Sequence, residues 1–214
     1  MFKKLMIVVI LAIAGVAGVA YYYWQQATSL PSWYQKSAEN ITKIQELPPA
    51  IIDKKTGGQV KLDGEQLNQF IGHKLAQDSK LRQVLPSTKA IHSDIKDGKL
   101  QIGAVVNTSK LLETNLSAQE RVVVDQLIQK IPQLQNRDIY VGVQGTPQLK
   151  DGKLVLGKDS QIKVGNLSFT PAQIAARLNL PVERVEQELA LNVQKLNLKD
   201  IKLNQGEMEL KFKQ

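Results

Sequence analysis

An uncharged run near the N-terminus limits the possible folds of this chain more than any other feature. The run reads LMIVVILAIAGVAGVAYYYW, extends from Leu5 to Trp24, and follows two lysines, Lys3 and Lys4. As a helix it would be about 30 Å long, which matches the hydrocarbon core of a bilayer. We therefore expect residues 1–24 to form a transmembrane anchor, with the rest of the chain outside the bilayer.

The charges that flank this run predict its orientation. Lys3 and Lys4 lie on one side, and the next cation along the chain is Lys36. Cytoplasmic flanks are enriched in lysine and arginine, so the N-terminus is expected in the cytoplasm. The predicted localisation is a single-pass protein of the cytoplasmic membrane, with residues 25–214 on its extracytoplasmic side.

A cleavable signal peptide is the alternative interpretation of the same segment. The small residues Gly18, Val19 and Ala20 offer a suitable cleavage site. The aromatic cluster at residues 21–24 favours a retained anchor, because tyrosine and tryptophan side chains prefer the membrane interface.

Beyond the run, the composition favours one folded domain preceded by a connector. Hydrophobic residues make up 43% of the chain and charged residues 22%, which is enough apolar material for a packed core. Residues 25–58 read as a juxtamembrane connector, in which Pro31 can open a helix that Pro48 and Pro49 end. The domain is expected to occupy residues 59–214.

Three segments of this domain predict β-hairpins. They read KDGKLQIG at residues 96–103, KDGKLVLG at residues 150–157 and LNQGEMEL at residues 203–210. Asp-Gly between alternating segments is a strong hairpin signal, since glycine accepts the positive φ that a tight turn requires. The alternation of apolar and polar residues in the flanking strands predicts antiparallel sheet with one dry face and one wet face.

Helical patterns lie between these hairpins. Asp63 can cap a long helix that Pro86 ends, and a capping box at residues 117–120 opens another that continues to Pro132. Together the patterns predict an α+β fold. We expect an N-terminal transmembrane helix followed by a curved antiparallel sheet of hairpins packed on a long helix, with shorter helices around it.

The segment TPAQIAARLNLPVERVEQEL, residues 170–189, has the pattern of a DNA-binding helix-turn-helix. Its second helix carries three glutamates against one cation, Arg184, which is the wrong charge for a groove lined by phosphates. We therefore expect a helical pair that packs on the sheet, with Glu183 and Glu186 exposed and no nucleic-acid partner. The residues expected to be buried are Ile174, Leu178, Val182, Val185 and Leu189.

Patterns typical of enzymes are absent from the sequence. The chain has no cysteine and two histidines, His73 and His92, which lack the spacing of metal ligands. Glycine-rich phosphate-binding motifs are absent as well. The letters His92-Ser93-Asp94 match a hydrolase triad, but consecutive strand residues point to opposite faces and cannot form a relay. We expect no enzymatic activity, no cofactor and no metal.

In its order of elements the chain resembles the YpmS-type single-span bacterial envelope proteins, which are similar to tubular lipid-binding (TULIP-like) domains. The resemblance covers residues 59–213 and rests on the anchor and three segments: LDGEQLNQFI, QIKVGNLSFTPAQIAARLNLPVERV and LNLKDIKLNQGEMELKF. It implies a sheet that curls around a long helix and leaves an apolar groove suited to acyl chains. A long, glutamine-rich segment between the two KDG hairpins departs from the family's pattern.

This resemblance and the apolar stripes lead to one functional expectation with an alternative. We expect a membrane-anchored, non-enzymatic envelope protein that binds or shuttles lipid or another hydrophobic ligand. The alternative is an assembly or scaffold protein for a membrane complex, with a membrane-protein partner and no ligand; DNA binding ranks third. The candidate groove residues are Leu67, Phe70, Ile71, Leu75, Leu100, Ile102, Ala104, Val106, Met208, Leu210 and Phe212.

Overall fold

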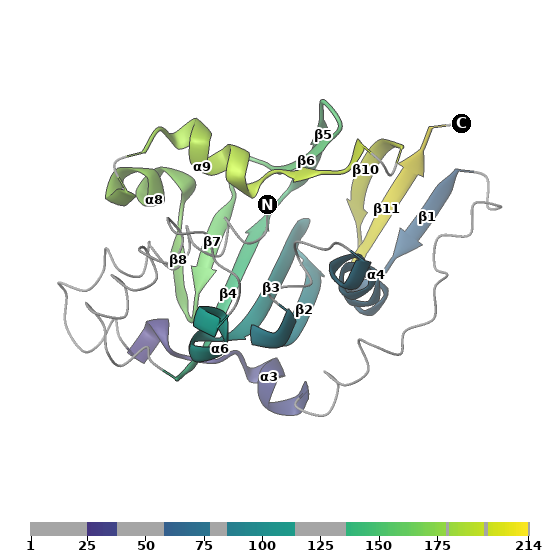
Figure 1. The fold of residues 1–214 in the computed structure, drawn as a ribbon. Coiled ribbons are helices and arrows are strands. Elements are labelled where there is room, and N and C mark those ends of the chain that lie inside the picture. Colours follow the sequence, from purple (N-terminus) through teal and green to yellow (C-terminus); the bar gives the residue numbers. More distant parts are fainter. Residues whose placement is uncertain are drawn as a thin grey trace.

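A computed structural model describes residues 25–37, 58–77, 85–113, 136–178, 180–194 and 197–213. This part of the chain has three antiparallel sheets with short helices around them (Figure 1), which confirms the α+β class of the prediction. The predicted transmembrane segment and the predicted helix at residues 117–132 lie outside the described residues. Among the helices that are described, none is long and apolar enough to cross a membrane.

The central sheet has five strands in the order β2-β3-β4-β7-β8, and every neighbouring pair is antiparallel. Its backbone ladder joins the first KDG hairpin to strands from the middle of the chain. The strands are β2 (Thr88–Lys96), β3 (Lys99–Asn107), β4 (Asp138–Gly145), β7 (Gln161–Val164) and β8 (Leu167–Phe169).

Two smaller sheets contain the other two predicted hairpins, so the hairpins are divided among three sheets and do not form one. The first has the order β1-β11-β10, with β1 (Gln59–Leu62), β10 (Leu198–Asn204) and β11 (Glu207–Phe212). The second has the order β5-β6-β9, with β5 (Pro147–Lys150), β6 (Lys153–Leu156) and β9 (Leu191–Asn192).

All three hairpin turns have the backbone conformation that their sequences predict. Both turn residues have positive φ in each case: 53° and 68° at Asp97 and Gly98, and 50° and 69° at Asp151 and Gly152. In the third turn φ is 40° at Gln205 and 89° at Gly206. Such turns match the right-handed twist of the paired strands, which is why they close two-residue hairpins.

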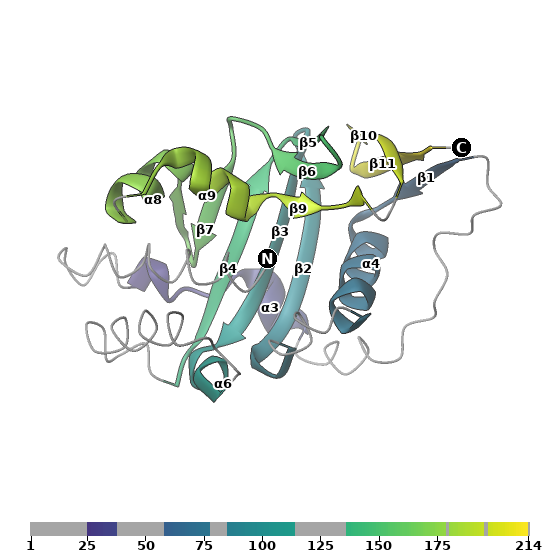
Figure 2. The same cartoon turned by 45° about the horizontal axis from the view of Figure 1, so that its top comes forward.

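The helices are short, and α4 lies beside β2 and β1 (Figure 2). Asp63 caps α4 reciprocally: its carboxylate accepts from Gln66 N–H at 2.8 Å, and its own N–H donates to Gln66 Oε1 at 3.0 Å. The pair Thr170 and Gln173 caps α8 in the same way. The helices are α3 (Ser32–Ser37), α4 (Gly64–Gln77), α6 (Thr108–Glu113), α8 (Pro171–Leu178) and α9 (Val182–Leu189), with a 3₁₀ turn at Leu85–Ser87.

The pair α8 and α9 packs on one face of the central sheet, as predicted. Ile174 and Val185 are fully buried and Leu189 nearly so, whereas Glu183 and Glu186 are exposed. Val182 is half-buried against the same cluster, and the side chain of Leu178 lies outside the described set. We call this cluster the helix-pair core. It comprises Ala104, Val106, Leu111, Ile139, Val141, Ile162, Val164, Phe169, Ile174, Ala175, Val185 and Leu189.

The opposite face of the central sheet was expected to be wet, and this prediction is wrong at its centre. Gly103, Tyr140 and Gly142 are buried there, and Val105 is fully buried. The cover comes from residues 25–37, which we call the strap. Its side chains Leu30, Trp33 and Tyr34 pack against Ala90, Val105 and Tyr140.

Candidate functional site

Most of the predicted groove residues meet in one apolar cluster, where α4, the β1-β11-β10 sheet and the adjacent ends of β2 and β3 come together. Eight of the eleven candidates belong to this cluster, which we call the junction core. These eight are Leu67, Phe70, Ile71, Leu100, Ile102, Met208, Leu210 and Phe212.

The remaining three candidates are placed differently. Ala104 and Val106 belong to the helix-pair core, although they lie on the same face of β3 as Leu100 and Ile102. Leu75 lies within α4, and its side chain is outside the described set. The candidates therefore do not line one continuous site.

Strand register explains how the small sheet presents an apolar face to the junction core. Met208 lies opposite Leu62 on β1 and Leu203 on β10, and Leu210 lies opposite Val60 and Ile201 in the same way. Because side chains alternate between the two faces of a strand, these rows of residues share one face. All of them belong to the junction core.

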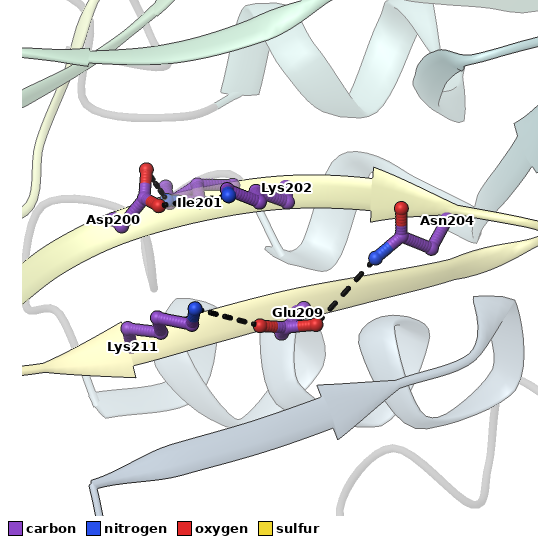
Figure 3. Close-up of polar contacts among 6 residues, drawn as sticks. All are labelled: Asp200, Ile201, Lys202, Asn204, Glu209 and Lys211. Carbon is purple, nitrogen blue, oxygen red and sulfur yellow. Dashed lines mark hydrogen bonds and ion pairs between the residues drawn. The ribbon is translucent and has the colours of Figure 1, made fainter.

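The other face of the same sheet is charged, as Figure 3 shows for β10 and β11. Glu209 is only 12% exposed; it forms an ion pair with Lys211 at 3.3 Å and accepts a hydrogen bond from Asn204 at 3.5 Å. Lys202 lies 3.8 Å from Asp200 on β10. The Lys202–Asp200 pair is exposed, and an exposed ion pair adds about 0–1 kcal/mol, so its main consequence is that this part of the face stays in water.

The junction core is less fully enclosed than the helix-pair core. Nine half-buried apolar residues pack around its eight buried members, whereas four surround the twelve buried members of the helix-pair core. The half-buried residues include Phe70 and Ile71 on α4, Ile102 on β3 and Phe212 on β11. The junction core is therefore the described apolar cluster with the larger share of partly exposed members.

Several members of the junction core were not predicted from the sequence. Ile95 faces it from β2, and Leu149 and Leu154 reach it from the β5–β6 hairpin. Ile201 could have been found, because Ile201 and Leu203 on β10 alternate with polar residues in the same way as the apolar residues of β11. Leu198 does not follow that alternation, because the register shifts between Leu198 and Asp200. Leu149 and Leu154 lie in the strands of a predicted hairpin, but local alternation does not show that this hairpin, which belongs to a separate sheet, packs against the junction core.

Hydrogen bonds hold α4 against β2 beside this cluster. The Ser93 hydroxyl, 2% exposed, lies 2.6 Å from Asn68 Oδ1 and 3.2 Å from the Gly64 carbonyl oxygen. Gly64 approaches β2 so closely that an added Cβ would lie 3.0 Å from the Ser93 carbonyl oxygen. Ser93 therefore faces α4.

His92, the neighbour of Ser93, faces the strap. Its ring stacks on Trp33 with a centroid separation of 4.7 Å. The two side chains leave β2 on opposite faces, which confirms that His92, Ser93 and Asp94 do not form a catalytic relay.

Polar residues lie near the buried Tyr140 ring, on the face of the central sheet that the strap covers. Gln101 Nε2 donates to the Tyr140 hydroxyl at 3.0 Å, and Lys163 Nζ donates to Gln101 Oε1 at 3.0 Å. Burial raises the pKa of Tyr140 and lowers the pKa of Lys163. The Tyr34 hydroxyl donates to Asp138 Oδ2 at 3.0 Å, and burial, followed by this carboxylate, raises the pKa of Tyr34.

The stacked His92 predicts a loss of stability on acidification. Burial lowers the pKa of His92 from its ordinary 6.5, while nearby Asp94 acts more weakly in the opposite direction. Below pH 6.5 the unfolded chain binds this proton more readily than the folded chain, so the contribution of His92 to stability falls as the pH falls through that window. Urea denaturation at about pH 7.5 and about pH 5.5 should show this loss, and the variant His92→Gln should lose less stability between the two pH values. An equal loss in both proteins would contradict the prediction.

The described residues contain no group of three or more histidine, cysteine, aspartate or glutamate side chains that could hold a metal ion. No protein-family model matches the sequence, and neither the curated proteins nor the solved structures contain a match. The structure's own geometry therefore carries the functional argument.

Proposed function

We propose that this chain is a membrane-anchored, non-enzymatic envelope protein whose extracytoplasmic domain binds a lipid or another hydrophobic ligand at the junction core. One observation carries the proposal. Eight predicted groove residues, from α4, β3 and β11, converge on an apolar cluster with many half-buried members. The resemblance to YpmS-type and tubular lipid-binding domains suggests the same kind of ligand.

The chemistry of the junction core suits an acyl chain. Its buried members are aliphatic residues and one methionine. Burial of an acyl chain contributes about 0.8 kcal/mol for each CH₂ removed from water. A ligand covering the half-buried side chains would also remove their apolar surface from water.

Sheet topology favours separation of the β1-β11-β10 sheet from the central sheet at the junction core. The β1-β11-β10 sheet and the central sheet are separate ladders among the described strands, so side chains join them across the junction core. Moving such layers apart disrupts packing and leaves the backbone hydrogen bonds of each sheet intact. Entry of a ligand between the two sheets therefore costs less free energy than entry between two strands of one sheet, where backbone hydrogen bonds would break.

The membrane supplies the source of ligand in this proposal. The uncharged run from Leu5 to Trp24 would retain the domain beside the bilayer, with the N-terminus inside. Tethering raises the effective concentration of lipid at the domain without adding any contact.

Photo-crosslinking of the full chain in vesicles tests the proposal. The vesicles contain a phospholipid with a diazirine on its acyl chain, and labelled peptides are identified by mass spectrometry. We expect label in peptides that contain Ile71, Ile102 or Phe212, in addition to label in residues 1–24. The variant Ile71→Trp should lower the label at the junction core about tenfold, because lost room for two methylenes costs about 1.6 kcal/mol.

Glu65→Trp is the matched control, since Glu65 is exposed on the same helix. It should leave the labelling unchanged. Label confined to the anchor would contradict lipid binding and leave the scaffold function as the better interpretation.

A further inference from the structure

The start of the strap is fixed to the turn between β7 and β8. The Asn166 N–H donates to the Gln26 carbonyl oxygen at 2.8 Å, and Ala27 is only 3% exposed. Gly165 has φ of +56°, and an added Cβ would collide with the carbonyl oxygens of Gln26 and Ala27. Only glycine allows the two backbone segments to lie this close.

The other end of the strap is held as well. Trp33 stacks on His92 and meets the Tyr140 ring edge to face with a centroid separation of 5.9 Å. The Tyr34 hydroxyl donates to Asp138 at the start of β4. With contacts at both ends, the strap belongs to the folded domain and fixes where the chain enters it.

The entry point lies very near the predicted anchor. Trp24, the last residue of the predicted anchor, lies three positions before the buried Ala27. A fully extended chain advances at most about 3.6 Å per residue, so this distance is at most about 11 Å. The β7–β8 turn, which is hydrogen-bonded to Gln26, therefore lies close to the end of the predicted anchor.

We propose that the corner formed by the β7–β8 turn rests on the outer surface of the membrane, against lipid headgroups. This inference rests on the anchoring in the proposed function. The corner offers exposed polar side chains, Asn166 and Ser168, and the strap sequence contains Lys36 and no acidic residue. A surface of this kind suits phosphate-bearing headgroups, since it offers hydrogen bonds and adds no negative charge.

The same geometry places the first hairpin turn away from the membrane. The β7–β8 turn lies beside Val141 on β4, because Val164 and Val141 are paired. Gly145, four residues along β4, is level with Leu100, and the Asp97–Gly98 turn lies beyond it. At about 3.4 Å per residue, roughly 20 Å along the strands separates the two turns (Figure 1).

Single-cysteine labelling tests this orientation, because the chain has no cysteine of its own. Asn166→Cys and Lys96→Cys, both at exposed positions, each receive the same fluorophore in the full chain. The proteins are reconstituted into vesicles with nitroxide-labelled phospholipid headgroups. We expect the label at residue 166 to be quenched several-fold more strongly than the label at residue 96.

A third variant, Val19→Cys, separates the two proposals. If its label is shielded from a water-soluble quencher while the labels at residues 166 and 96 are quenched equally by the headgroup nitroxide, the orientation is wrong and the anchoring stands. If the label at residue 19 is freely accessible to the water-soluble quencher, the anchoring fails. Gly165→Val in the Asn166→Cys protein should reduce the quenching at residue 166, because it releases the strap from the turn.

Discussion

Replacing Ile174 by alanine is expected to lower the free energy of unfolding by about 2–5 kcal/mol. Ile174 is fully buried in the helix-pair core, where α8 packs on the central sheet. The change removes apolar contacts and leaves a cavity, because the surrounding strands hold its walls in place. Urea denaturation of the purified protein, followed by circular dichroism, measures the loss.

Glu183→Ala provides the matched control on the neighbouring helix. Glu183 is exposed on α9, so its replacement should change the unfolding free energy by no more than about 0.5 kcal/mol. Equal stability of Ile174→Ala and the unaltered protein would mean that the helix pair is not part of the core. Such a result would revive its interpretation as a separate helix-turn-helix unit.

The second large effect is expected from Gly103→Val. A Cβ at residue 103 would collide with the ring of Tyr140, which is 3% exposed and lies across both Gly103 and Gly142. The ring would have to move, with loss of its hydrogen bond from Gln101 and its contact with Trp33. Forcing extra volume into a packed site costs about 1–3 kcal/mol, which urea denaturation can detect.

A double variant distinguishes this cause from a general weakening of β3. Gly103→Val together with Tyr140→Leu removes the ring that the new side chain would strike. The double variant should then be less destabilised than the sum of the two single variants, because the two positions are in direct contact. Additive losses would show that the ring of Tyr140 is not the obstacle.

Local patterns predicted the three hairpin turns and the start of α4 correctly. The Asp97–Gly98 and Asp151–Gly152 turns and the cap at Asp63 depend on residues only a few positions apart. The division into three sheets depends on which strands meet across the chain, and local alternation does not encode that choice. The same limit explains why one face of the central sheet was wrongly expected to be exposed to water. The strap that covers Tyr140 on this face lies more than 100 residues earlier in the sequence.

The candidate site was predicted in part for a similar reason. Alternation along β3 correctly placed Leu100, Ile102, Ala104 and Val106 on one face of the sheet. Alternation does not show which other elements pack on that face at each end of the strand. Leu100 belongs to the cluster formed with the small sheet and α4, whereas Val106 belongs to the cluster that contains residues of α6, α8 and α9.

The pairing of β1 with β11 also determines when the domain can finish folding. Val60 lies opposite Leu210, so one ladder joins residues that are 150 positions apart. Contacts of such high sequence separation form late, because a long loop must close before they contribute. In the proposed topology the chain crosses the membrane from its N-terminus, so Leu62 and the rest of β1 would emerge well before their partner strand. The apolar face of β1 would stay uncovered until β11 arrives, and that interval is when the chain would need a chaperone.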